Sequence, residues 1–304
     1  QNKHTPEIIK SYAHVGVRFI AGEKPPKHWL AKNYAYQQLV EAANGDLLLF
    51  CGVDTRFEVG SLRAMVALLG AKRKRMISFI PKNVWPAAWN PLSLVIQPAR
   101  YAWELSLPRR LFKRPPVLST CWLITAEELK HAGGFAATAN SVSVESFFAR
   151  HAIGHDDGYS FLQSDEAIGL LSAKSLAEQR ATAVRVRYPQ LHRRPELVAL
   201  IGLLQFIFLV GPMVLLAIGI IAGLPWLIGV SGLATVLTAS SFSLVASLTY
   251  RDFRFTSLYL LPFAALYDIG LLNYSMWRYE FREVIWKGRN VCIPIMQVIA
   301  ALPK

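Results

Sequence analysis

The sequence predicts an α/β domain, with a mostly parallel sheet and helices on both faces, followed by a C-terminal transmembrane helical region. Two observations carry this prediction. Short apolar runs alternate with amphipathic stretches over the first two thirds of the chain. Between Glu196 and Arg251 there is no Asp, Glu, Lys or Arg, and this stretch is more than twice the ~20 residues that cross a bilayer. We therefore expect a domain at 1–190 and a transmembrane region at 191–304.

The composition agrees with a chain that is partly embedded in a membrane. Of the 304 residues, 53% are hydrophobic and 17% are charged, and the net charge is +13. Soluble domains carry about 25% charged residues, so an ordinary soluble domain is excluded. The three cysteines, Cys51, Cys121 and Cys292, lack CxxC spacing. A disulfide framework or a thiolate metal site is not expected, and reduced cytoplasmic thiols fit best.

The first part of the chain has the alternating pattern of strands and helices that is typical of an α/β sheet. Residues 17–20 predict a strand and residues 28–43 a helix. The continuous apolar run at 46–50 predicts a buried central strand of a parallel sheet. A helix at 58–69 and a strand at 76–80 follow. Because the chain starts without Met or a signal peptide, we expect the domain to be incomplete at its N-terminus.

The apolar part divides into segments at its prolines and charges. Residues 91–112, rich in Trp, Tyr, Leu and Arg, predict either an interfacial segment on lipid headgroups or a core helix beside a surface loop. Two spans are expected at 197–222 and 225–249, joined by a tight turn. A weaker third span is expected at 255–277.

The positions of the basic residues predict the orientation of these spans. Arg193 and Arg194 precede the first span, and Arg251 and Arg254 follow the second. By the positive-inside rule both ends of this hairpin lie in the cytoplasm, and so does the globular domain. The basic tail after the third segment favours the same side, which leaves the number of crossings there open. The sequence thus predicts a multi-pass membrane protein whose domain faces the cytoplasm.

Asp54 follows the predicted central strand, where α/β sheets present strand ends to ligands. A carboxylate at this place can hold a hard divalent cation, Mn²⁺ or Mg²⁺, that neutralises a diphosphate leaving group. The alternative is a turn or cap residue.

Further motifs occur in a fixed order around Asp54. They are Trp29-Leu30-Ala31-Lys32-Asn33, Gly133-Gly134-Phe135, Val144-Glu145 and Arg185-Val186-Arg187-Tyr188. With the apolar helices behind them, they resemble the motifs of the membrane-anchored family 2 glycosyltransferases, particularly the ceramide-glucosyltransferase-like and hopanoid-associated branches. That family has W-x-G-K-N, D-x-D, GGF, E-D and Q-x-x-R-W in the same order.

The resemblance implies a GT-A fold and an inverting transfer of a sugar from a nucleotide-sugar donor to a membrane lipid acceptor. It implies that Glu145 is the catalytic base and that Asp54 binds the divalent cation. Donor-binding roles fall on six residues: Lys32, Asn33, Asp54, Arg185, Arg187 and Tyr188. The turn Gly133-Gly134-Phe135 lies on the acceptor side. The alternatives without a catalytic role are a solvent-facing Glu145 near a helix N-terminus and arginines whose charged ends reach the lipid headgroups ahead of the first span.

Three positions depart from the family pattern and support a rival hypothesis. Gly52 replaces the first Asp of D-x-D, Val144 replaces the Glu of the E-D pair, and Val184 replaces the Gln of Q-x-x-R-W. The rival is a catalytically inactive GT-A-like membrane protein that binds a partner protein or lipid.

Nucleic acid is not an expected partner, because the basic run at 72–75 has no interleaved aromatic residues and fits a loop attracted to anionic lipid. His155 and the acidic residues after it are interpreted as surface charge. The oligomeric state, the sugar and the lipid are left open.

Overall fold

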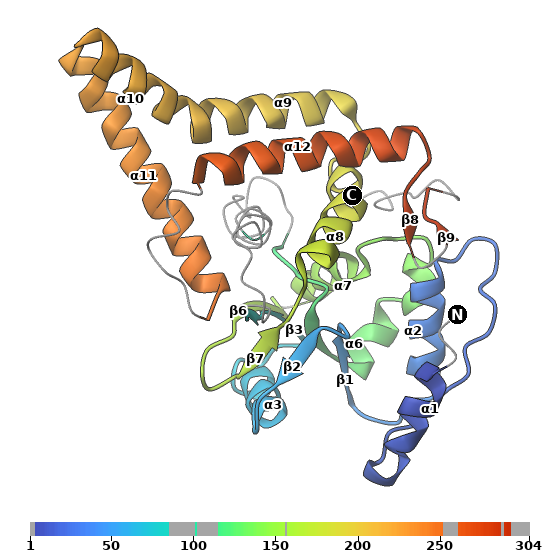
Figure 1. The fold of residues 1–304 in the computed structure, drawn as a ribbon. Helices are drawn as coiled ribbons and strands as arrows, with labels where there is room; N and C mark the ends of the chain where they lie inside the picture. The colour runs from blue at the N-terminus through green and yellow to red at the C-terminus, as the bar shows by residue number, and fades with distance from the viewer. Residues whose placement is uncertain are drawn as a thin grey trace.

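The structure is a computed structural model that describes residues 4–84, 101, 115–155, 157–251, 261–286 and 289–292. It has a mixed α/β part and a helical part (Figure 1). The main sheet has four strands in the order β1 (Leu47–Cys51), β5 (Cys121–Thr125), β3 (Met76–Ile80) and β6 (Tyr159–Gln163).

The prediction of a mostly parallel sheet is wrong. β5 pairs antiparallel with both β1 and β3, whereas β3 and β6 are parallel. The strands β1, β3 and β6 therefore point the same way, as the alternating pattern predicted. The insertion of β5 between β1 and β3 converts one expected parallel pairing into two antiparallel ones. For the same reason β1 lies at an edge of the described sheet and is not its central strand.

Shorter strands complete the α/β part. A second sheet has the order β2 (Thr55–Phe57), β7 (Leu170–Ser172) and β4 (Lys82–Asn83). In it, β2 and β7 are antiparallel and β4 and β7 are parallel. Near the C-terminus, β8 (Ile285–Trp286) and β9 (Arg289–Asn290) form an antiparallel pair. Both larger sheets are thus mixed.

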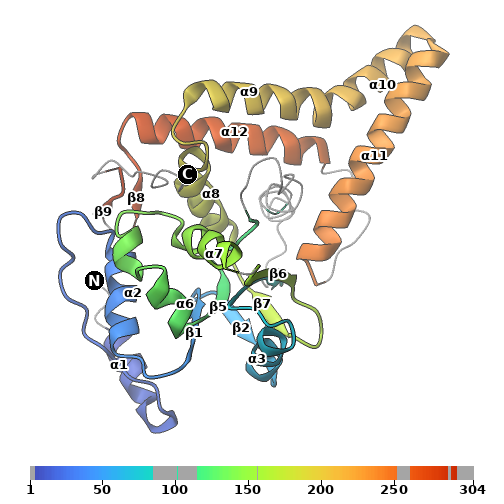
Figure 2. The ribbon, with the colours of Figure 1, turned by 180° about the vertical axis from the view of Figure 1, so that it is seen from behind.

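Helices cover both faces of the main sheet, as predicted (Figures 1 and 2). One face packs against α2 (Ala31–Glu41), α6 (Ala126–His131) and α7 (Val144–Gly154), and the other packs against α3 (Ser61–Ala71). Alternate residues of the strands supply the two cores: Phe50, Trp122 and Ile124 point to the first, and Cys121 and Leu123 to the second. A period of two is what a sheet buried on both sides requires.

The predicted helices at 28–43 and 58–69 are confirmed as α2 and α3, and the strand at 76–80 is confirmed as β3. The strand predicted at 17–20 is wrong, because no strand forms there. No described strand lies alongside this segment, so its backbone gains no ladder of hydrogen bonds. The helix α1 (His4–Ser11) and the short 3-10 helix η1 (Ala13–Val15) precede it.

The helical part follows α8 (Leu176–Gln190). It consists of α9 (Pro195–Gln205), the π-helix η3 (Phe206–Val210), α10 (Gly211–Ala222), α11 (Pro225–Thr249) and α12 (Leu261–Glu280). The predicted turn is confirmed: Gly223 adopts φ +63° at the end of α10, a left-handed conformation that glycine tolerates best. α12 runs along α9 and packs against α8, which crosses it (Figure 1).

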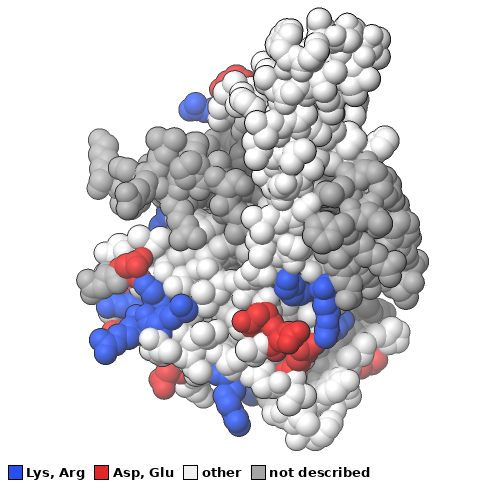
Figure 3. All heavy atoms as spheres, turned by 90° about the vertical axis from the view of Figure 1, so that its left-hand side faces the viewer, with Lys and Arg blue, Asp and Glu red and all other residues white. Residues whose placement is uncertain are grey.

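Two helices are long and apolar enough to cross a membrane, 195–222 and 225–249, in agreement with the two predicted spans. Their most apolar windows are only 11% and 6% buried within the part of the chain that the structure describes. Side chains such as Phe208, Ile221 and Trp226 are largely exposed. Figure 3 shows their projecting end without charge, whereas the charged side chains on this face gather mainly at the other end. Exposed apolar surface of this extent marks contact with lipid or protein.

Two predicted segments are described only in part. The interfacial segment at 91–112 lies outside the described residues except for Tyr101, which is buried. Of the third predicted span, residues 261–277 belong to α12, and residues 255–260 lie outside the described part.

Candidate functional site

Asp54 lies in the turn between β1 and β2, where its carboxylate already has two partners. Ser172 Oγ donates a hydrogen bond of 3.1 Å to Asp54 Oδ2, and Lys174 Nζ lies 3.2 Å from the same oxygen. The side chains of Lys174 and Asp54 are only 15% and 14% exposed. The negative charge of Asp54 is therefore balanced by an ammonium group inside the protein.

This arrangement does not fit a divalent cation at Asp54. Mg²⁺ and Mn²⁺ need several oxygen ligands, and the lysine occupies the face of the carboxylate that a metal would take. A Cβ atom on Gly52 would lie 2.6 Å from Asp54 Oδ1, so a second carboxylate there would force Asp54 out of this rotamer. The observed rotamer of Asp54 therefore requires glycine at position 52. The divalent cation at Asp54 stays a prediction that this arrangement does not support.

Glu145 lies in the first turn of α7 and is 5% exposed, which excludes the solvent-facing alternative. Ser143 Oγ donates a hydrogen bond of 3.0 Å to Glu145 Oε1. The other oxygen, Oε2, is buried and accepts no hydrogen bond from the described residues. The positive end of the α7 dipole favours the carboxylate, but a buried oxygen without a donor is unfavourable. A buried polar atom without a partner can be satisfied by a ligand, an ordered water or a reacting group.

Glu145 and Asp54 each influence the titration of a side chain between them at one end of the sheet. Tyr36 has its pKa raised to about 12, first by burial and then by the charges of Glu145 and Cys51. The pKa of Cys51 is raised by partial removal from water and then by Asp54. Lys32 Nζ lies 5.3 Å from the centroid of the Tyr36 ring. We name this set the sheet-end cluster: Lys32, Tyr36, Cys51, Asp54, Glu145 and Lys174.

Asn33 has a structural position next to this cluster. Its Nδ2 donates to the carbonyl oxygens of Thr138, Ala139 and Ser141 at 2.8, 3.2 and 2.8 Å, and the residue is 1% exposed. These bonds tie α2 to the loop that leads into α7. Asn33 therefore fixes the backbone ahead of Glu145.

The GGF turn lies in the same loop. Gly133 and Gly134 adopt φ values of +83° and +63°, which explains why glycine stands at both positions. They turn the chain after α6 so that Phe135 enters the core. There it contacts the rings of Tyr36, Phe50 and Phe148. Phe135 is fully buried, so in this structure the motif builds the core under the sheet-end cluster.

The predicted phosphate-binding residues of α8 are directed to α12 and lie apart from the sheet-end cluster. Arg187 forms an ion pair with Asp268, and both side chains are less than 10% exposed. Gln205 Nε2 donates to the other Asp268 oxygen at 2.8 Å. The Tyr188 hydroxyl lies 2.7 Å from Glu280 Oε1.

The carbonyl oxygen of Arg185 accepts from Tyr279 Oη at 2.5 Å. The charges of Arg187 and Asp268 thus stabilise the packing of α8 against α12 and α9. Of the predicted set, Lys32, Asp54 and Glu145 lie at the same end of the sheet, whereas Arg187 and Tyr188 pack against α12.

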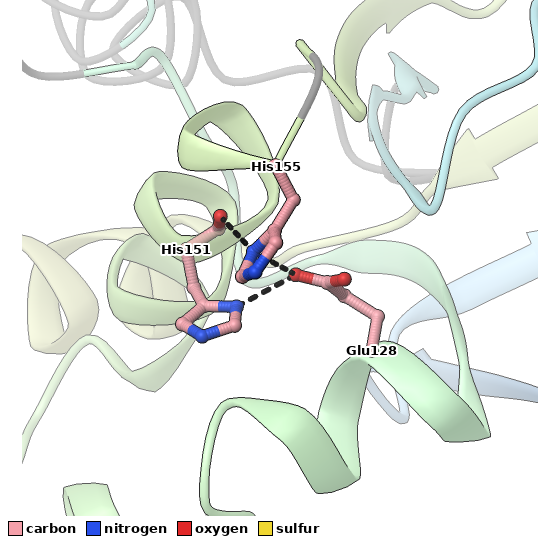
Figure 4. Close-up of side chains that lie close together, drawn as sticks. All are labelled: Glu128, His151 and His155. Carbon is pink, nitrogen blue, oxygen red and sulfur yellow. Dashed lines mark hydrogen bonds and ion pairs between the residues drawn. The ribbon is translucent and has the colours of Figure 1, made fainter.

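A different cluster was missed by the sequence analysis, which treated His155 as surface charge. Glu128 of α6 lies beside His151 and His155 at the end of α7 (Figure 4). The available signal was the spacing of the two histidines, four residues apart on one face of a helix. The third member comes from an element that the sequence analysis did not identify.

The basic run at 72–75 also has partners within the protein. Lys74 Nζ lies 3.0 Å from Asp157 Oδ2, and Arg75 Nη1 lies 3.3 Å from Glu128 Oε2. At least two of its four charges are therefore paired and only partly available to lipid.

The chain matches no protein-family model, no curated protein and no solved structure. The function must therefore be argued from the arrangement of its own residues.

Proposed function

We propose that this protein is an inverting glycosyltransferase that moves a sugar from a nucleotide-sugar donor to a lipid acceptor at the cytoplasmic face of a membrane. The observation that carries the proposal is Glu145, whose buried carboxylate leaves Oε2 without a donor among the described residues. It lies at the same end of the sheet as Asp54 and Lys174, where positive and negative charges meet.

In this proposal Glu145 is the general base. Its carboxylate takes the proton from the acceptor hydroxyl as that oxygen attacks the anomeric carbon of the donor. The new carbon–oxygen bond forms while the bond to the nucleotide diphosphate breaks, which inverts the configuration in one displacement. A base in hydrogen-bond reach contributes typically about 10²–10⁴-fold. No covalent enzyme intermediate is required.

The leaving diphosphate needs positive charge, and lysines supply it in this chain. Lys174 lies beside Asp54, and Lys32 lies over Tyr36, within the sheet-end cluster. When a diphosphate arrives, Lys174 can share its charge between Asp54 and a phosphate oxygen. Fixed positive charge at the site where negative charge develops lowers the barrier without reorganisation of water.

The apolar hairpin would keep the lipid acceptor close to the site. The last turn of α11 is joined to the second sheet: Arg251 N donates to Asn83 O at 3.1 Å, and Asn83 Nδ2 donates to Thr249 O at 2.9 Å. The domain is thereby fastened to the helices that could cross a membrane. An acceptor held in the bilayer then needs only local positioning. The basic residues at the hairpin ends favour a cytoplasmic domain.

The test is turnover by the full-length protein in lipid nanodiscs, supplied with a panel of nucleotide sugars and bacterial or eukaryotic lipid extracts. Glu145→Gln keeps the size of the side chain and removes the base, so turnover should fall about 10²–10⁴-fold. Glu127→Gln, at an exposed position on α6, is the matched control and should leave turnover unchanged. Equal turnover in both variants would remove Glu145 from the mechanism.

One observation favours a second candidate, the inactive membrane protein that binds a partner protein or lipid. Asp54 is already neutralised by Lys174, as expected of a site that no longer binds a metal and nucleotide. The discriminating measurement is thermal stability with nucleotide diphosphates, with and without Mn²⁺ or Mg²⁺. Stabilisation by nucleotide supports the enzyme, and dependence on the cation supports the predicted metal. No response to any nucleotide supports the inactive protein.

A further inference from the structure

A cluster of Glu128, His151 and His155 lies away from the sheet-end cluster, at the other end of α7 (Figure 4). Glu145 and His155 are ten positions apart on or next to this helix. At 1.5 Å per residue they are separated by about 15 Å along its axis. The start of α6 lies at the Leu47 end of β1, opposite Cys51, which agrees with this separation. We propose that these three side chains form a Zn²⁺ site, independent of the proposed transferase function.

The geometry of the three ligand atoms suits one small ion. His151 Nδ1 and His155 Nδ1 lie 2.7 and 3.9 Å from Glu128 Oε1. All three ligand atoms lie within 4.8 Å of one another. With Zn–N and Zn–O bonds of about 2.0–2.2 Å, tetrahedral ligand atoms lie about 3.3 Å apart, between the two observed values. Coordination of one ion would require the two imidazole rings to move until their ligand atoms and Glu128 Oε1 lie at this spacing.

The contacts of Glu128 position its carboxylate to bind a metal ion. Its side chain is fully buried, and a buried carboxylate requires compensating charge. Arg75 Nη1 lies 3.3 Å from Oε2, which leaves Oε1 directed to the histidines. The backbone of Glu128 is fixed as well, because its N–H donates to the N-cap Thr125 Oγ1 at 3.2 Å. One oxygen is thus held by the protein, and the other is presented as a single ligand.

The chemical types of the three ligands favour zinc. Two imidazoles and one carboxylate are ligands that zinc takes with a fourth position for water, whereas Mg²⁺ and Ca²⁺ prefer oxygen ligands only. The ion would take the place of the direct 2.7 Å contact between His151 Nδ1 and Glu128 Oε1. His155 Nδ1 must also give up its 3.3 Å contact with the carbonyl oxygen of His151. Binding would therefore join α6 to the C-terminal end of α7, while Arg75 keeps Glu128 tied to the start of β3.

The experiment is a calorimetric titration of Zn²⁺ into the full-length protein in detergent after treatment with a chelator. We expect one equivalent to bind at this site and to raise the midpoint of thermal unfolding. Loss of a partner outside the coordination shell weakens binding by about 10–100-fold, so His155→Ala, which removes a ligand, should weaken it by about 100-fold or more. Glu128→Gln should do the same, and Mg²⁺ should not displace the ion.

Three variants keep the test interpretable. His131→Ala changes an exposed histidine of α6 and Cys51→Ser removes the exposed thiol, so both should bind Zn²⁺ as the parent does. His155 is about half exposed, so His155→Ala should fold even if Glu128→Gln does not. The absence of Zn²⁺ binding, or equal binding by His155→Ala and the parent, would overturn the proposal.

Discussion

Asp54 and Glu145 are two carboxylates at the same end of one sheet, and they have opposite surroundings. Asp54 has a lysine and a serine on one oxygen. Glu145 is more deeply buried, receives one hydroxyl, and forms no salt bridge within the part of the chain that the structure describes. By motif alone, both were predicted to take part in chemistry. The surroundings indicate that Asp54 holds Lys174 in place, whereas one oxygen of Glu145 has no hydrogen-bond partner among the described residues.

The largest expected effect on stability concerns a third carboxylate, Asp268. Its two oxygens contact Arg187 and Gln205, one each, whereas the two partners of Asp54 share a single oxygen. Asp268→Ala leaves the buried Arg187 without its partner, which costs about 3–5 kcal/mol. Denaturant titration in detergent measures the change. The double variant Asp268→Leu with Arg187→Met should recover most of the loss. A loss below about 1 kcal/mol for the single variant would show that this pair does not hold α8 to α12.

Asn33→Ala tests the loop that presents Glu145. Its amide serves three carbonyl oxygens, and a buried polar group without a partner costs about 1–3 kcal/mol. We expect a loss of about 3 kcal/mol in chemical unfolding. Asn44→Ala, at an exposed position after α2, is the control and should change stability by less than about 0.5 kcal/mol. Similar results for both variants would mean that the loop is held by other contacts.

Asp54→Ala should have a smaller effect, because Lys174 retains some access to water. We expect a loss of about 2 kcal/mol, between the values for exposed and buried pairs. A double-mutant cycle with Lys174→Met isolates the pairwise energy, which should be about 1–2 kcal/mol. Additive effects of the two substitutions would mean that Asp54 and Lys174 do not interact, and the contrast with Glu145 would disappear.

The smallest effect is a change in the titration of Tyr36. Glu145→Gln should lower the pKa of Tyr36 from about 12, but only partly, because burial is the larger cause of the elevation. The pKa of Tyr36 in the folded state lies above the ordinary value of 10.0, so the folded state holds this proton more tightly than the unfolded chain does. The contribution of Tyr36 to the free energy of unfolding is therefore fully present below pH 10 and is lost as pH rises through about 12. Tyr36→Phe should therefore lose less stability over this window. NMR titration with labelled tyrosine measures the pKa, and an unchanged value in Glu145→Gln contradicts the contact.

Local patterns predicted much of the fold and little of its connectivity. The periodicity of apolar residues identified α2, α3, β3 and the two long apolar helices, because each depends on neighbours in sequence. The position of β5 depends on pairing between residues about 70 positions apart in β1 and β5, which no local pattern records. The prediction of a mostly parallel sheet was wrong because it did not place β5 between β1 and β3.

The same limit applies to the candidate site. The sequence predicted Asp54 and Glu145 as chemical groups, but the partner of Asp54 lies at position 174 and the partner of Arg187 at position 268. Arg187 was predicted to bind phosphate because its charge suits phosphate oxygens, and a buried aspartate satisfies that charge equally well. Which anion an arginine meets is decided by tertiary structure.

The π-helix η3 divides the first long apolar helix into two parts with different neighbours. α9 and η3 contact α12, whereas α10 packs on α11, which η3 also contacts. The wider turn of a π-helix accommodates one extra residue, which rotates the two halves relative to each other by roughly 100°. Deleting a single residue within 206–210 should restore a regular α-helix, and one of the two pairings would then meet the wrong side chains. The apolar helix would remain almost as long as before. The contact of α10 with α11 and the contact of α9 with α12 could then no longer form together.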